Sequence, residues 1–142
     1  DGFQNTKAFL SIAKDYVTKQ ITEEFKVEKT DQIDMLNRSV AYFKQNESFN
    51  KEEFEESVFQ NEEVISSFRE FDSSYREENE IQIKDNFEIS DQAVKKQARF
   101  FKSILKLDKN FHVYIHGDKS KIEKGVESDG RKFYKIYYEK ED

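Results

Sequence analysis

Six basic residues occur within fifteen positions in the last third of the chain, and they are the clearest sign of a binding function. Asp108 is the only acidic residue among them. Lysine and arginine bind nucleic acid by releasing the counterions condensed on its phosphates, which requires charge but no base-reading geometry. A protein contact surface and a plain solvated surface are the alternatives. The candidate nucleic-acid-binding residues are Lys95, Lys96, Arg99, Lys102, Lys106 and Lys109.

Two histidines have the spacing of a possible metal site. His112 and His116 form an H-x-x-x-H pattern, which on a helix would present both imidazoles to one metal ion. The surrounding residues alternate as in a strand, where four positions separate two side chains by about 13 Å. One zinc ion does not span that distance, so we predict no metal site and two half-exposed histidines on a sheet.

No catalytic or nucleotide-binding motif emerges from the remaining polar residues. Neighbouring glutamates such as Glu52 and Glu53 fall on polar helix faces, where solvation explains them. Ser120 lacks the strand-turn-helix context of a nucleophile elbow, and a chain with four glycines contains neither type of glycine-rich phosphate loop. We therefore expect a protein that is not an enzyme and binds no cofactor. A hydrolase completed by another region of a longer protein is the remaining enzymatic alternative.

Composition indicates one folded unit rich in aromatic side chains. The chain has 142 residues, of which 35% are hydrophobic and 38% charged, but 14 Phe and 7 Tyr provide large rings for a core. It contains no cysteine and no apolar run long enough to span a membrane, which favours the cytoplasm. Because helical periodicity begins almost at Asp1, we interpret the chain as a fragment of a larger protein.

The two parts of the chain carry opposite charge. Residues 1–90 hold 11 basic and 21 acidic residues, a difference of −10, whereas residues 91–142 hold 13 and 9, a difference of +4. We accordingly expect an acidic helical part, 1–90, and a part, 91–142, with a basic helix and an antiparallel sheet. An anion-binding face is expected in the second part.

Helical spacing dominates the first part. Phe9, Tyr16 and Ile21 mark one face of a helix over 6–25, and Thr30 or Asp31 could cap a second that ends near residue 46. The clearest start signal is Asn50 with Glu53, flanked by the apolar pair Phe49 and Phe54. Further helices are predicted over 62–78, after Asn61, and over 91–99, after Ser90.

Strand alternation follows from residue 101. Residues 101–107 and 111–116 predict a hairpin, because Phe111, Val113 and Ile115 alternate with His112, Tyr114 and His116. Gly117 and Asp118 are expected to turn the chain into a short helical segment over 119–124. A turn at 129–130 then leads to a strand over 133–138. The prediction is an α+β fold in which four to five helices form the first two-thirds and a small antiparallel β-sheet follows.

Long stretches of the chain resemble a known family. The segments KKQARFFKSILKLDKNFHVYIHGDKSKIEKGV and GRKFYKIYYEKE are similar to the end of the bacterial nucleoid-associated protein family typified by NdpA (YejK), and EKTDQIDMLNRSVAYFKQNESFNKEEFEESVF is similar to its helical middle. The resemblance implies a bacterial cytoplasmic protein located at the nucleoid, without established enzymatic activity. It supplies no catalytic or base-reading residues.

Two functions follow as hypotheses. The first is a non-enzymatic nucleoid-associated protein that reaches DNA directly or through other nucleoid proteins. The second is an interaction module, which uses its acidic helical part on a basic partner or pairs with itself through the aromatic strand edge to form a homo-oligomer. Neither hypothesis involves a membrane.

Overall fold

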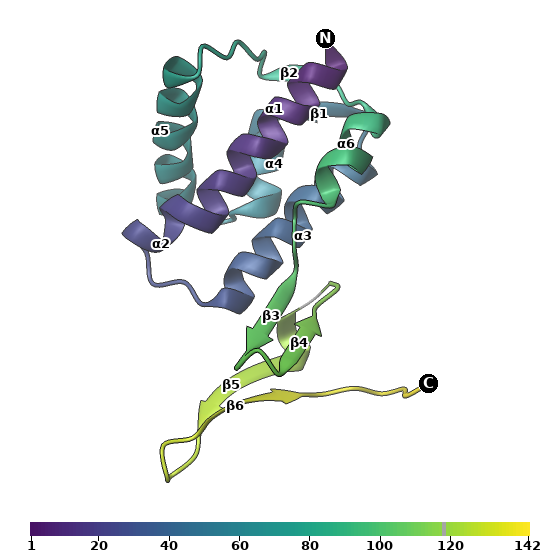
Figure 1. Cartoon of the computed structure of the whole chain (residues 1–142). Helices are drawn as coiled ribbons and strands as arrows, with labels where there is room; N and C mark the ends of the chain where they lie inside the picture. The colour runs from purple at the N-terminus through teal and green to yellow at the C-terminus, as the bar shows by residue number, and fades with distance from the viewer. Residues whose placement is uncertain (118) are drawn as a thin grey trace.

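Helices and short strands divide the molecule into a helical body and two ribbons. The computed structural model describes residues 1–117 and 119–142, and its α+β architecture confirms the predicted fold class (Figure 1). The helices are α1 (Gly2–Asp15), a π-helical turn (Tyr16–Gln20), α2 (Ile21–Glu24), α3 (Lys29–Gln45), α4 (Lys51–Val58), α5 (Glu62–Glu78) and α6 (Asp91–Ala98). The strands are β1 (Ser48–Asn50), β2 (Asn86–Glu88), β3 (Ile104–Leu107), β4 (Phe111–Tyr114), β5 (Ile122–Val126) and β6 (Lys132–Ile136).

Three helices start at the residues that the sequence indicates. The Asn50 side chain accepts a hydrogen bond from the Glu53 backbone N–H at 3.0 Å, and the Asn61 side chain accepts one from the Glu63 N–H at 2.8 Å. Ser90 accepts from the Ala93 N–H at 3.3 Å. These caps satisfy backbone donors that the first turn of a helix leaves free, and they confirm the predicted starts of α4, α5 and α6.

The first two helices differ from prediction at their ends. The first begins at Gly2, because the Asp1 carboxylate caps it, and a π-helical turn interrupts it at Tyr16–Gln20. The cap of α3 is Glu28 instead of Thr30 or Asp31, because Asp31 occupies the third helical position and completes a capping box by accepting from the Glu28 N–H. A carboxylate can act at the cap or at the third helical position, and the sequence pattern does not distinguish the two.

A cluster of phenylalanine rings forms the centre of the body. Phe9 of α1 is completely buried and lies 4.4 Å from Phe49, 5.0 Å from Phe54 and 5.9 Å from Phe68, measured between ring centroids. Phe43 of α3 joins the same cluster at 6.3 Å. The rings come from α1, α3, β1, α4 and α5, so one contact network connects most of the body.

The strands form three separate antiparallel ladders instead of the single sheet expected. β1 pairs with β2, β3 with β4, and β5 with β6. The β1–β2 ladder was not predicted, because each strand has three residues and the two lie far apart in sequence. Residues 122–124, predicted as helical, belong to strand β5, whose partner β6 follows the predicted turn at Asp129 and Gly130. Only Lys119–Lys121 is helical, as a 3₁₀ turn, and Asp118 of the expected turn lies outside the described residues.

The β3–β4 hairpin is present close to the predicted position, with shorter strands. β3 begins at Ile104 instead of Phe101, and a turn with positive φ at Asp108 and Lys109 leads to β4, which ends at Tyr114. Leu105 is buried and its partner Val113 is half-buried, although Phe111 on the same face is 63% exposed. Alternation identifies which residues share a face of a strand, but it does not identify how deeply each of them is buried.

Helix α6 belongs to the body, although it follows the change in charge near residue 90. It packs against α1 and α3. The chain before it runs close to the start of α1: the Ser90 N–H donates to Thr6 Oγ1 at 3.1 Å, and a Cβ atom on Gly2 would come within 2.6 Å of the Glu88 carbonyl oxygen. The basic end of α6 is thereby held on a rigid support.

Replacement of Phe9 tests the role of the ring cluster. We expect Phe9→Ala to lower the free energy of unfolding by about 3–5 kcal/mol, because it leaves a cavity among four rings. Urea denaturation followed by circular dichroism measures the loss. The matched control is Phe111→Ala at an exposed position, for which the change should stay within about 0.5 kcal/mol. Equal effects of both substitutions would contradict the central role of Phe9.

Candidate nucleic-acid interface

The side-chain amide of Asn37 on α3 connects the helical body to the β3–β4 hairpin. The Asn37 Nδ2 group donates to the Ile115 carbonyl oxygen at 3.1 Å, and the Ser103 hydroxyl donates to Asn37 Oδ1. The Ile115 N–H also donates to the Ser103 carbonyl at 2.9 Å, which extends the ladder beyond the two strands. Asn37 therefore holds the residue before β3 and the residue after β4 against α3.

An ion pair fixes the segment that follows the hairpin. The Lys119 ammonium group contacts the Asp31 carboxylate at the start of α3. Although burial by itself raises the pKa of Asp31, hydrogen bonds from Lys119 and the Glu28 N–H, with the charges of Lys119 and Arg38, lower it below its ordinary value of 3.8. Asp31 is therefore ionised at neutral pH and pairs with Lys119.

A basic cleft lies between the hairpin, α3 and the end of α6. We call it the hairpin cleft; its volume is about 530 Å³. Four cationic side chains line it, together with both histidines and Tyr114, and no acidic residue is among the described residues of its wall. Those cations are Lys44, Arg99, Lys102 and Lys106.

A second cleft, of about 660 Å³, shares part of β3 with the first. Lys102 and Lys106 line both clefts. The second cleft adds three lysines from the first helices, and Asp15 is the only carboxylate among its described lining residues. The added lysines are Lys14, Lys19 and Lys29.

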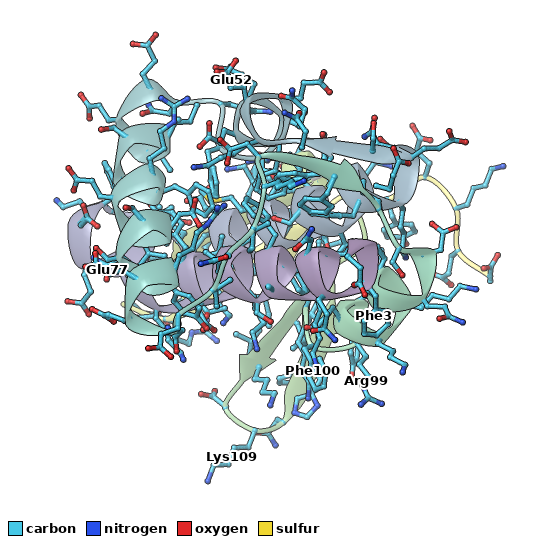
Figure 2. The ribbon with its side chains drawn as sticks, turned by 90° about the horizontal axis from the view of Figure 1, so that it is seen from above. Phe3, Glu52, Glu77, Arg99, Phe100 and Lys109 are labelled. Atoms are coloured by element: carbon cyan, nitrogen blue, oxygen red, sulfur yellow. The ribbon has the colours of Figure 1, made fainter. Side chains whose placement is uncertain are left out.

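The six predicted residues are all exposed, but they fall into three places. Arg99, Lys102 and Lys106 meet at the hairpin cleft. Lys95 and Lys96 lie on α6, where the Lys96 ammonium group is 5.4 Å from the centre of the Phe3 ring. Lys109 lies at the tip of the hairpin turn. Figure 2 shows Arg99, Phe100 and Lys109 on one side of the molecule and Glu52 on the opposite side.

Sequence reasoning missed four lysines because they belong to the acidic part of the chain. Lys14, Lys19, Lys29 and Lys44 reach the clefts only after the hairpin folds back onto α1 and α3. A partial signal existed for Lys44, which follows Asn37 and Val40 at the spacing of one helix face. Nothing local indicated that this face would meet β3.

The cations at the hairpin cleft differ from those that pair with buried carboxylates of the body. Lys51 and Arg76 bind the buried Asp72 at 2.9 and 2.7 Å, and Arg69 binds the buried Glu55 at 2.9 Å. No described carboxylate lies within ion-pair distance of Lys44, Arg99, Lys102 or Lys106. Arg99 instead lies over the Phe100 ring at 4.9 Å. These cations are consequently available to an external anion.

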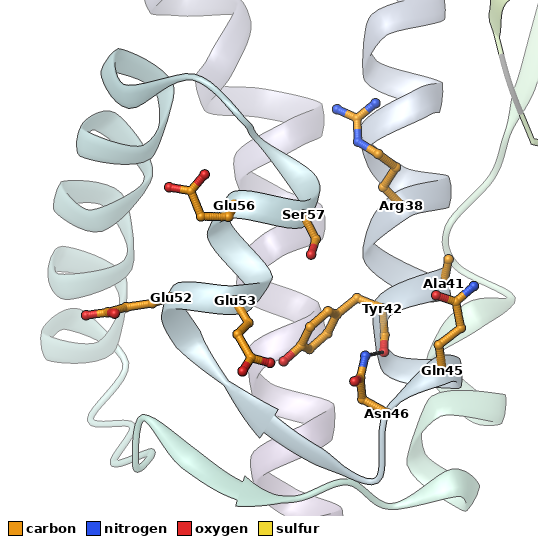
Figure 3. Close-up of a pocket in the computed structure, with 9 residues that line it drawn as sticks. All are labelled: Arg38, Ala41, Tyr42, Gln45, Asn46, Glu52, Glu53, Glu56 and Ser57. Atoms are coloured by element: carbon orange, nitrogen blue, oxygen red, sulfur yellow. Dashed lines mark hydrogen bonds between the residues drawn. The ribbon is translucent and has the colours of Figure 1, made fainter.

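The groove between α3 and α4 has the opposite character. Figure 3 shows Glu52, Glu53 and Glu56 on the α4 side of this groove, which has a volume of about 620 Å³. Arg38 also lines it, but its guanidinium group donates to the Val58 carbonyl at 3.0 Å and pairs with Asp34. A phosphate group would be repelled here, so the two sides of the molecule suit different partners.

The histidines occupy a different arrangement from the one predicted. His112 lies in β4, whereas His116 lies beyond the end of the strand, and both line the hairpin cleft. Within residues 1–117 and 119–142 there is no group of three or more potential metal ligands. Over the same residues, no helix has the length and apolar character needed to cross a bilayer.

The fold and the clefts define a class of protein: an aromatic helical body that holds a β-hairpin and presents a basic cleft without an acidic residue in its described wall. A family model described as nucleoid-associated protein YejK matches residues 1–132 of the 142, and the chain belongs to this family. Membership supports a role at the nucleoid. Searches of curated proteins and of solved structures found no match.

Removal of the Asn37 amide tests how the hairpin is held. We expect Asn37→Ala to lower the free energy of unfolding by about 1–3 kcal/mol, since it leaves the partly buried Ile115 carbonyl and Ser103 hydroxyl without this partner. Hydrogen exchange at the Ile115 amide should accelerate. Asn46→Ala is the control, because Asn46, the residue after the last turn of α3, donates to the Tyr42 carbonyl oxygen of that helix and does not contact the hairpin through this bond. Unchanged exchange at Ile115 in Asn37→Ala would show that other contacts hold the hairpin.

Proposed function

We propose that this protein is a non-enzymatic nucleoid-associated protein that contacts DNA directly through its basic surface, in the cytoplasm of a bacterial cell. The basic surface comprises the six predicted residues Lys95, Lys96, Arg99, Lys102, Lys106 and Lys109 and the four lysines Lys14, Lys19, Lys29 and Lys44. One observation carries the proposal. Cations from α1, α3, α6 and β3 converge around the hairpin, and at the hairpin cleft no described carboxylate pairs with them.

Counterion release gives this arrangement a driving force for DNA binding. Each lysine or arginine that contacts a phosphate returns a condensed cation to solution, which is favourable at low salt whatever the base sequence. The contact needs no helix in the major groove, and the proposal includes none. DNA contact of this kind should be weak in sequence preference and strongly dependent on salt.

The net charge of −6 is compatible with this proposal because the charges are segregated. Attraction to a phosphate decays over a Debye length of about 8 Å at physiological ionic strength, so charges beyond that distance contribute little. The glutamates of the acidic groove belong to α4, whereas the cations of the hairpin cleft belong to α3, the end of α6 and the segment that leads through β3. DNA should therefore bind with one orientation, with the hairpin toward the duplex.

A salt titration tests direct contact with DNA. We expect the chain to bind a labelled duplex at low salt, and log K to fall linearly with log salt concentration, because each phosphate contact contributes a slope of about −0.9. Simultaneous replacement of Lys95, Lys96 and Arg99 by Glu should abolish binding. Fluorescence anisotropy measures both. Absence of binding by the wild-type chain even at low salt would refute direct contact by this region.

A pair of matched substitutions separates the basic surface from net charge. Lys102→Glu and Lys84→Glu make the same change in charge, but Lys84 is an exposed residue between α5 and β2. We expect Lys102→Glu to weaken binding and to reduce the salt slope by about 1, and Lys84→Glu to change neither. Equal losses would mean that overall charge, rather than this surface, governs affinity.

Self-association is a second candidate function, and the β5–β6 ribbon favours it. Val126 and Ile136 lie on the same face of the ribbon and are 64% and 51% exposed. The outer edge of each strand has no pairing strand among the described residues. A second copy of the chain supplies a matching strand edge and a matching apolar face across a two-fold axis, which would cover both.

Light scattering over a range of concentrations tests this candidate. We expect the apparent mass of the wild-type chain to rise with concentration. Val126→Asp combined with Ile136→Asp should keep it at the monomer mass, since the paired charges would repel across the two-fold axis. Phe111→Asp, on the other ribbon, is the control and should associate as the wild type does. A strict monomer at every concentration would rule out self-association.

A further inference from the structure

One face of the β3–β4 hairpin combines positive charge with flat rings. The register places Ile104 opposite Tyr114 and Lys106 opposite His112, so these four side chains share a face. All four line the hairpin cleft, and Tyr114 is 65% exposed. The cleft therefore has a floor of an aromatic ring, an imidazole and an ammonium group, with Lys44, Arg99 and Lys102 around it.

The spacing of the rings suits a strand whose bases are separated. His112 and Tyr114 are two residues apart in a β-strand, which places their side chains about 7 Å apart. Stacked bases in a duplex repeat every 3.4 Å along each strand, and their faces are covered by neighbouring bases. Only a nucleic acid with unstacked bases can place one base face on a ring of this strand.

The size of the cleft leads to the same choice. A volume of about 530 Å³ is that of a pocket for a small molecule, within the usual range of about 300–1,000 Å³. A duplex is far too wide to enter such a space and can only lie across its rim. A single strand can pass a nucleotide into the cleft, with its phosphates near Arg99 and Lys102 and its base on the ring floor.

We propose that the hairpin cleft binds single-stranded nucleic acid, with a base stacked on Tyr114 and the flanking phosphates bound by Arg99, Lys102 and Lys44. The proposal rests on the proposed function for its charged contacts but extends it, because stacking favours a single strand over a duplex. Aromatic rings beside a basic groove are the usual means of binding single strands without base readout. DNA and RNA single strands share this chemistry, and the test distinguishes them.

Competition among three oligonucleotides tests the preference. The chain is titrated with fluorescein-labelled dT12, rU12 and a 12-base-pair duplex, and anisotropy gives each affinity at the same salt concentration. We expect dT12 to bind more tightly than the duplex. Comparable binding of rU12 would identify the ligand as single strands of either sugar, whereas weaker binding of rU12 would identify it as single-stranded DNA.

Substitutions at Tyr114 test the stacking contact. Tyr114→Leu should weaken binding of dT12 by about 5- to 150-fold and change duplex binding less than about twofold, since it removes the ring but no charge. Tyr114→Phe keeps the ring and should bind dT12 as the wild type does. Tyr138→Leu is the matched control, because Tyr138 is 66% exposed and lies after β6. Circular dichroism confirms that each variant is folded.

The outcomes separate this inference from the proposed function. Duplex binding without a preference for dT12, or an equal loss of both ligands in Tyr114→Leu, would overturn the inference and leave direct DNA contact in place. Binding of dT12 that depends on Tyr114, without duplex binding, would support the inference and refute direct duplex contact. Failure of the wild-type chain to bind any of the three oligonucleotides at low salt would refute both.

Discussion

The packing of phenyl rings around Phe9 is the constraint on which the rest of the structure depends. Only 35% of the residues are hydrophobic, so a core of aliphatic side chains would be small for a chain of this length. Each buried ring removes a large apolar area from water, and contacts between edges and faces of rings add to the stability. Because the rings come from α1, α3, β1, α4 and α5, the helices do not stabilise one another in pairs but through one shared cluster.

Helix α3 transmits this stability to the basic clefts. Its Phe43 joins the ring cluster, while Asn37 holds the hairpin and Asp31 holds the segment after it. Lys44 lies one turn further along the side that carries Asn37 and Val40, and it completes the wall of the hairpin cleft. Helix α3 therefore fixes the backbone that carries Lys44 and the hairpin, and cations on a fixed backbone lose less entropy when they bind phosphate than cations on a flexible loop.

The helices can be predicted from residues close together in sequence. The strand pairing and the candidate site depend on contacts between residues far apart in sequence. Asn50, Asn61 and Ser90 each have a hydrogen-bond partner within three residues, so their caps can be identified from sequence. The β1–β2 ladder pairs Phe49 with Phe87, which no local pattern indicates. The hairpin shows the limit most clearly. Its strands were expected near their observed positions, but its attachment to α3 involves Asn37, 78 residues before its partner Ile115. The candidate site was for that reason predicted only in part.

Folding also determines which charges remain available for binding. Glu55 and Asp72 are buried, each 1% exposed, and a buried carboxylate without a partner costs several kcal/mol. These two carboxylates therefore pair with Arg69, Lys51 and Arg76, which removes three cations of the acidic part from any role at the surface. The cations of the hairpin cleft face no such requirement, because no carboxylate is buried among its described lining residues. An external phosphate can therefore bind only the cations that do not pair with buried carboxylates. At the hairpin cleft the charges of this kind are positive, although the chain as a whole is negative.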